Sequence, residues 1–146
     1  MRTIAPLSVI LLSVLAAGAV AQQNALPRTP APAGAAVYFV APANGAQVKS
    51  PVTVRFGLRG MGVAPAGVTN ANTGHHHLLV DVATLPPDNL PLPANDNVRH
   101  FGGGQTEVEL TLTPGTHTLQ LALGDALHIP HDPPLRSEKI TITVVE

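Results

Sequence analysis

The stretch that decides the fold is residues 73–82, Thr-Gly-His-His-His-Leu-Leu-Val-Asp-Val. Successive side chains of a β-strand point to opposite faces, so a strand here divides the three consecutive histidines into two groups. His76 shares a face with the apolar residues that follow, and we expect it to point into the core in a structural role. His75 and His77 share the opposite face with Asp81. The run therefore predicts one strand with a core side and a side that presents a histidine pair.

The rest of the chain repeats the two-residue period of this strand. Apolar and polar residues alternate, fully or briefly, in six further segments, at 37–40, 47–48, 52–58, 106–112, 117–123 and 139–145. Long loops rich in glycine or proline separate them at 59–73, 83–105 and 124–136. No segment has a convincing helical period. The pattern predicts an all-β fold, an antiparallel β-sandwich of the immunoglobulin or fibronectin type III kind with about seven short strands.

Pro114 and Gly115 separate two of these segments, residues 106–112 and 117–123. A proline followed by a glycine is typical of a tight turn. Two alternating segments on either side of such a turn predict a β-hairpin.

The composition excludes several classes of function. The sequence has no cysteine, which excludes disulfides, thiolate metal ligands, cysteine nucleophiles and a lipid-modified cysteine anchor. Eight Lys and Arg residues face nine Asp and Glu residues, so the chain is nearly neutral. Without a basic patch we expect no nucleic-acid partner.

The first residues predict export. Arg2 precedes an apolar run, and Ala19-Val20-Ala21 has the small residues of a cleavage site, so residues 1–21 are predicted to be a signal peptide. Residues 22–36 are rich in proline and alanine and predict a flexible linker. Residues 37–146 then form the β-sandwich domain. We expect a periplasmic or secreted protein with no membrane span after signal cleavage.

All seven histidines fall between His75 and His131, and this clustering suggests a metal site. His75 and His77 are two residues apart on one strand face, with Cα atoms about 6.6 Å apart. Two imidazoles at that spacing can converge on one ion at about 2.0 Å each. His128 and His131 form a second pair on a proline-stiffened loop, and His100 lies on another long loop. The predicted metal ligands are therefore His75, His77, His100, His128 and His131.

The predicted ion is zinc or copper(II), because imidazole suits these ions and the chain has no thiolate. Asp81 and Asp125 are candidates for a carboxylate ligand or for a hydrogen-bond acceptor behind a ligating histidine. On this interpretation the protein is an exported binding module for a divalent transition metal.

An alternative interpretation is structural. A histidine at a strand end can hydrogen-bond to loop backbone, and His76 and His117, which lie in phase with the core, are the best candidates for that role. The protein would then be a non-catalytic structural or interaction domain of the cell envelope, with an envelope protein as its partner. Zinc-dependent or chelator-sensitive melting would argue against this alternative.

The sequence contains no convincing catalytic constellation, so we predict a protein that is not an enzyme. Beyond the predicted signal peptide the serines are Ser50 and Ser137, and neither lies beside a histidine in the sequence. The glycines at 102–104 lack the lysine and the strand-to-helix context of a phosphate loop, and they predict a flexible turn instead.

Four motifs occur in a fixed order along the chain. They are GHHHLL at 74–79, HFGGGQTE at 100–107, HTLQL at 117–121 and HIPHDPP at 128–134. In this combination, which extends over roughly residues 40–146, the chain resembles a bacterial family of exported proteins described only as a domain of unknown function. The resemblance implies a bacterial protein of the periplasm or the extracellular space. It implies no activity.

Overall fold

The computed structural model describes residues 27–146, and this part of the chain is built from strands, turns and loops without a helix. The predicted signal peptide, residues 1–21, lies outside the described residues. The strands are β1 (Ala36–Ala41), β2 (Gln47–Lys49), β3 (Val52–Arg59), β4 (Gly62–Val63), β5 (Thr73–Val80), β6 (Val98–His100), β7 (Glu107–Leu110), β8 (Gly115–Gly124) and β9 (Ile140–Val145). In residues 27–146, no helix has the length and apolar character that crossing a membrane requires.

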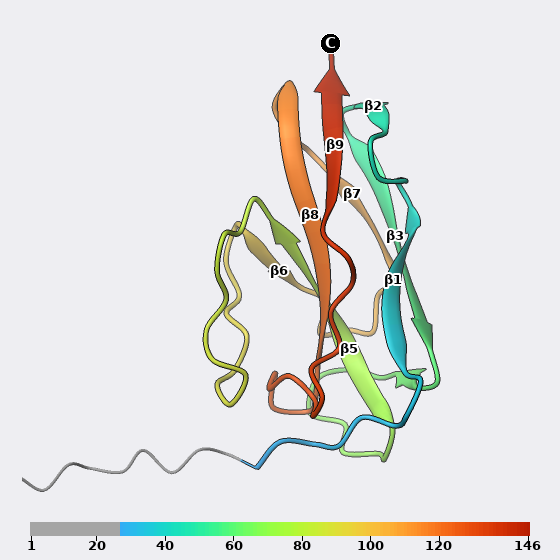
Figure 1. Cartoon of the computed structure of the whole chain (residues 1–146), viewed down its shortest axis with the longest axis vertical. Helices are drawn as coiled ribbons and strands as arrows, with labels where there is room; N and C mark the ends of the chain where they lie inside the picture. The colour runs from blue at the N-terminus through green and yellow to red at the C-terminus, as the bar shows by residue number, and fades with distance from the viewer. Residues whose placement is uncertain (1–26) are drawn as a thin grey trace, which may run out of the picture.

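The strands form two sheets, which confirms the predicted all-β, sandwich-like fold. One sheet has the order β1-β3-β7, and the other has the order β2-β9-β8-β5-β4, with β6 also paired to β5. Figure 1 shows β1 and β3 on one side of β8 and β9, and β6 with its neighbouring loop on the other side. The larger sheet is curled (Figure 1).

The main core lies between the two sheets. It is made by the inward-facing residues that the alternation predicts, including Val54 and Phe56 of β3, Leu78 of β5 and Leu121 of β8. Each large apolar side chain buried in this way stabilises the fold by about 1.5–3 kcal/mol. His76 belongs to this side of β5, and its ring lies 5.3 Å from the ring of Phe56, centre to centre.

Strand β5 is buried on both faces, because a loop covers the side that faces away from the main core. The loop that follows β5 returns across this side and forms a second, smaller apolar cluster of Leu79, Leu92, Val98 and Ala122. The amide of Leu92 donates to the carbonyl oxygen of His128 at 2.8 Å, which joins this loop to the loop after β8. The side that carries His75 and His77 is therefore an interior surface.

The predicted hairpin of residues 106–112 and 117–123 is wrong. Strand β7 pairs with β3 in the smaller sheet, whereas β8 pairs with β5 and β9 in the larger one. The turn at Pro114 and Gly115 therefore connects the two sheets. Alternation shows that both strands have an apolar face, but that face can meet the core from either sheet.

The two short strands β4 and β6 were not predicted, because each lies within a segment rich in glycine or proline that we expected to be a loop. Strand β6 lies within the predicted loop 83–105. It pairs antiparallel with β5 over His77–Leu79, and this pairing determines the position of His100.

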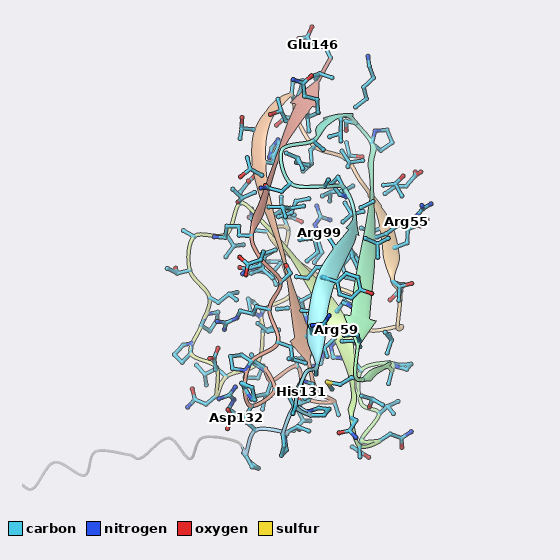
Figure 2. All side chains as sticks on the ribbon, turned by 45° about the vertical axis from the view of Figure 1, so that its right-hand side comes forward. Arg55, Arg59, Arg99, His131, Asp132 and Glu146 are labelled. Atoms are coloured by element: carbon cyan, nitrogen blue, oxygen red, sulfur yellow. The ribbon has the colours of Figure 1, made fainter. Side chains whose placement is uncertain are left out.

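The described part of the N-terminal segment lies against the loop after β8. Arg28 donates to the carbonyl oxygen of Pro130 at 3.2 Å and forms an ion pair with Asp132 at 3.2 Å. The hydroxyl of Thr29 donates to the carboxylate of Asp125 at 2.7 Å. Figure 2 shows Asp132 and His131 at this end of the domain, close to where the described chain begins.

Candidate functional site

The candidate site begins with three histidines on adjacent strands. His75 and His77 point to the side of β5 that faces away from the main core, as the alternation predicts. His77 lies directly opposite His100 in the antiparallel pairing of β5 with β6. Side chains of directly opposed residues are near neighbours, and long side chains also reach the diagonal positions. The strand register thus places His100 beside both His77 and His75.

A fourth histidine, His128, comes from the loop after β8. The carboxylate of Asp125 accepts hydrogen bonds from the amides of Leu127 at 2.9 Å and Ile129 at 3.0 Å. The amide of His128 donates to the carbonyl oxygen of Asp125 at 2.9 Å. These bonds hold His128 at a φ of 68°, a left-handed conformation that is uncommon for residues other than glycine. The loop is folded around Asp125 so that His128 faces β5.

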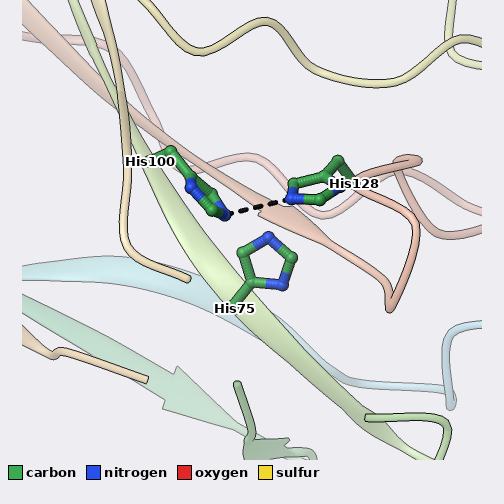
Figure 3. Close-up of side chains that lie close together, drawn as sticks. All are labelled: His75, His100 and His128. Atoms are coloured by element: carbon green, nitrogen blue, oxygen red, sulfur yellow. Dashed lines mark hydrogen bonds between the residues drawn. The ribbon is translucent and has the colours of Figure 1, made fainter. Parts of the chain in front are cut away.

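The four rings lie close together. The distances between ring centres are 4.9 Å for His75–His77, 5.0 Å for both His75–His100 and His75–His128, 5.1 Å for His77–His100, 4.7 Å for His100–His128 and 6.0 Å for His77–His128. The Nε2 atoms of His100 and His128 are 3.1 Å apart. One nitrogen from each of His75, His100 and His128 lies within 4.8 Å of the other two. Figure 3 shows a nitrogen of His75 directed towards the gap between the other two rings.

Small residues on the neighbouring strand leave room for these rings. Gly124 and Ala122 of β8 lie opposite His75 and His77. A Cβ atom on Gly124 would come within 3.0 Å of Cε1 of His77 and 3.2 Å of Cα of His128, tighter than nearly all real contacts. A Cβ atom on Gly102 would overlap the ring of His100. A side chain at Gly102 would therefore have to displace the ring of His100, and one at Gly124 would crowd the ring of His77 and the backbone of His128.

Among the described residues, the two deepest rings of the group have no hydrogen-bond partner. The side chains of His75 and His77 are 0% exposed, and neither nitrogen of either ring meets a donor or an acceptor. Leaving a buried polar group unpaired costs about 1–3 kcal/mol, so native proteins usually satisfy such groups. Within residues 27–146, the four ring nitrogens of His75 and His77 thus lie together without a partner, and both nitrogens of His76 on the core side of β5 have none either.

The environment favours the neutral form of these histidines. Burial, together with the neighbouring rings of His128 and His100, lowers the pKa of His75 to about 4, although the negative charge of Asp125 opposes the shift. Burial and the other three rings lower the pKa of His77 to about 3. Burial also lowers the pKa of His100. At pH 7 these rings are neutral, which is the form of histidine that binds metal ions.

The structure brings together four of the five predicted ligands and leaves out His131. Nε2 of His131 lies 3.2 Å from the carbonyl oxygen of Thr73, to which it can donate, and the ring is fully buried beside the loop. The spacing of His128 and His131 suggested a pair, but the turn around Asp125 directs only His128 towards β5. His131 instead ties the loop to the start of β5.

The two predicted carboxylates take structural positions. Asp81 forms an ion pair with Nδ1 of His117 at 2.7 Å and accepts a hydrogen bond from the amide of Thr118 at 2.8 Å. Asp125 organises its own loop and the N-terminal segment, as described above. Of the two, Asp125 is the one near the histidine group, because its charge acts on His75.

Sequence reasoning missed the parts that shape the site. Strand β6, which positions His100, lies in a segment that we expected to be a loop, and the roles of Gly102 and Gly124 depend on rings that are distant in sequence. The one available signal was the glycine run directly after His100, which we interpreted as a flexible turn. A glycine two residues after a candidate ligand can equally make room for its ring.

A comparison with protein families identifies the chain. The family model described as "Domain of unknown function (DUF4399)" matches residues 54–145, more than half of the sequence. The chain therefore belongs to this family, and the predicted resemblance is confirmed. No curated protein and no solved structure matches the chain. The match extends over all four histidines of the site.

Proposed function

We propose that this member of the DUF4399 family is an exported module that binds one divalent transition metal ion, zinc or copper(II). His75, His77, His100 and His128 would supply the ligands. The observation that carries the proposal is the set of four unpaired nitrogens on His75 and His77, buried beside two further imidazoles. Imidazole nitrogen is a preferred ligand of both ions, whereas calcium and magnesium prefer oxygen.

The electrostatics of the site agree with this proposal. A metal ion competes with protons for histidine, so a site whose rings are already neutral at pH 7 has few protons to release. Burial alone makes protonation of His75 and His77 costly. An ion bound through nitrogen lone pairs would instead satisfy ring atoms that have no partner within the described residues.

Equilibrium dialysis of the purified protein against zinc and copper(II), followed by elemental analysis, tests the proposal. We expect one equivalent of metal per chain in the wild type and much less in the His100→Ala variant. His100 is solvent-accessible, so its replacement should leave the fold intact. His117→Gln is the matched control, because this histidine pairs with Asp81 away from the site. Absence of stoichiometric binding in the wild type would contradict the proposal.

A second candidate function is a structural or interaction domain of the cell envelope that needs no metal. Two histidines favour it. Nε2 of His117 lies 2.9 Å from the carbonyl oxygen of Thr113, and Nε2 of His131 lies 3.2 Å from that of Thr73. Both histidines can therefore hold backbone groups in place by hydrogen bonding. On this alternative, chelators leave the melting temperature unchanged and an envelope protein is the partner. A chelator-induced drop in melting temperature would exclude it.

A further inference from the structure

The arrangement of the four rings indicates which coordination geometry, and therefore which ion, the site would favour. Resting on the metal site proposed above, we propose that the site is a closed tetrahedron of four imidazoles that takes zinc, and that holds the ion without leaving a coordination position open for chemistry. The four ligands are His75, His77, His100 and His128.

The first argument is the spacing of the rings. Zinc in a protein binds four ligands tetrahedrally, with nitrogen at about 2.0–2.1 Å. The centre of an imidazole ring lies farther out along the same line, so the ring centres of four ligands should be about 5 Å from one another. Five of the six distances between ring centres are 4.7–5.1 Å. The sixth, His77–His128, is 6.0 Å and requires only a small approach of one ring.

A square plane, the geometry that copper(II) prefers, does not match this spacing. In a square-planar site each imidazole lies opposite one other, so the four ligands form two opposite pairs with ring centres about 6.3 Å apart. Each residue belongs to only one of these pairs. His77 and His128, at 6.0 Å, could form one opposite pair. The other pair would then be His75 and His100, whose ring centres are only 5.0 Å apart. The four ring centres therefore lie at the corners of a tetrahedron and not in a plane.

The nitrogen positions support the same geometry for three of the four rings, His75, His100 and His128, and the ring of His77 would have to turn to bring a nitrogen into this group. Two nitrogens on one tetrahedral zinc ion are about 3.3 Å apart, and the Nε2 atoms of His100 and His128 are 3.1 Å apart. The nearest nitrogen of His75 completes a group in which no two atoms are more than 4.8 Å apart. As Figure 3 shows, His100 and His128 lie on one side of that group and His75 lies beneath them. The ion would enter from the side of the two accessible rings.

A site with four protein ligands has consequences for function. Catalytic zinc sites keep one position for water or substrate, whereas structural sites are closed by four protein ligands. Here the ion would join β5, β6 and the loop after β8, three segments that are far apart in the sequence. Asp125, 6% exposed, would provide a carboxylate near the site, where its charge acts on His75. The site therefore fits retention of zinc and stabilisation of this end of the domain.

Cobalt(II) is a spectroscopic probe for this geometry, because tetrahedral cobalt absorbs visible light strongly and five- or six-coordinate cobalt absorbs weakly. We expect titration of the metal-free protein with cobalt to give strong visible bands that saturate at one equivalent and disappear when zinc is added. His77→Gln should still bind cobalt, but its bands should shift, weaken and become pH-dependent, because a water molecule that can lose a proton would take the fourth position.

The outcomes separate this inference from the proposed function. Weak absorption with one bound cobalt in the wild type, or a His77→Gln spectrum that matches the wild type at every pH, would overturn the closed tetrahedron while leaving a metal site. Absence of cobalt and zinc binding in the wild type would overturn both. If His77→Gln does not fold, the accessible His100→Ala variant should show the same spectral change at cobalt concentrations high enough to overcome its weaker binding. His117→Gln should match the wild type, and a loss of intensity in this control would place the ion elsewhere.

Discussion

The two ends of the β5–β8 strand pair use histidine in opposite ways. At one end, four histidines lie together, and burial lowers the pKa of His75 and His77. At the other end, His117 lies beside Asp81, and the hydrogen bond with this carboxylate raises its pKa. The difference teaches that the partner of an imidazole decides its role in this fold. A carboxylate favours the charged form of the imidazole, and burial among other imidazoles favours its neutral form.

Acid should destabilise the metal-free protein most strongly. An unfolded histidine titrates near pH 6.5, whereas His75 and His77 in the folded protein have pKa values of about 4 and about 3. Between these values the unfolded chain binds more protons, so the free energy of unfolding falls as the pH decreases from about 6.5 towards 4. We expect a loss on the order of 3 kcal/mol between pH 7 and pH 5, measured by urea denaturation after chelation.

The same measurement on a His75→Asn/His77→Asn variant sharpens this prediction. Its pH profile should be flatter, since two of the groups with lowered pKa values are gone, while burial still lowers the pKa values of His76 and His100. Equal unfolding free energies of the wild type at pH 7 and pH 5 would contradict the expected burial of neutral rings.

Removal of one ligand should weaken zinc binding by about 100-fold or more. This effect is larger than is typical for residues that hydrogen-bond to a ligand without contacting the metal. We expect this result for His128→Ala, measured by competition with a chelating dye. His117→Gln should change the affinity by less than about twofold, because its ring faces Asp81. Equal losses in the two variants would remove the distinction between the two ends of the strand pair.

Zinc should raise the stability of the wild-type protein. An ion present at 100 times its dissociation constant stabilises the folded state by about 2.7 kcal/mol, which corresponds to several degrees in melting temperature for a domain of this size. Calorimetry with zinc and with a chelator measures the difference. The His100→Ala variant should show little of it, and a full shift in that variant would argue against His100 as a ligand.

Gly102→Ala should lower zinc affinity by roughly tenfold without unfolding the domain. The added Cβ would overlap the ring of His100 and displace it, while the backbone at this position does not have a positive φ. Gly62→Ala is the matched control, because its Cβ would make only an ordinary 3.6 Å contact with Thr73. Unchanged affinity in Gly102→Ala, with circular dichroism like the wild type, would show that the ring of His100 is not needed in this position.

The smallest effect is expected at the other end of the strand pair. The raised pKa of His117 means that its stabilisation is fully present below pH 6.5 and is lost as the pH rises through the folded pKa. Because Asp81 is 42% exposed, solvent screens the pair, and His117→Gln should cost about 1 kcal/mol or less at pH 6 and less still at pH 8. An equal cost at both pH values would indicate a packing effect instead.

Much of the architecture was predictable because alternation is a local property. The inward faces of β3, β5, β8 and β9 follow directly from the order of apolar and polar residues. The separation of His76 from its two neighbours follows from the same rule. The partners of each strand were not predictable in this way, and the expected hairpin failed because β7 and β8 belong to different sheets.

By itself, the sequence determined the all-β class, the two faces of residues 75–77 and the supply of imidazoles without thiolates. The tertiary structure decided which imidazoles meet. The register of β6 on β5 brings His100 to His77, and the turn around Asp125 brings His128 to His75 while His131 turns to Thr73. The physical reason is that spacing along a strand is set by covalent geometry. Proximity between loops depends on the pairing and packing of segments far apart in the chain.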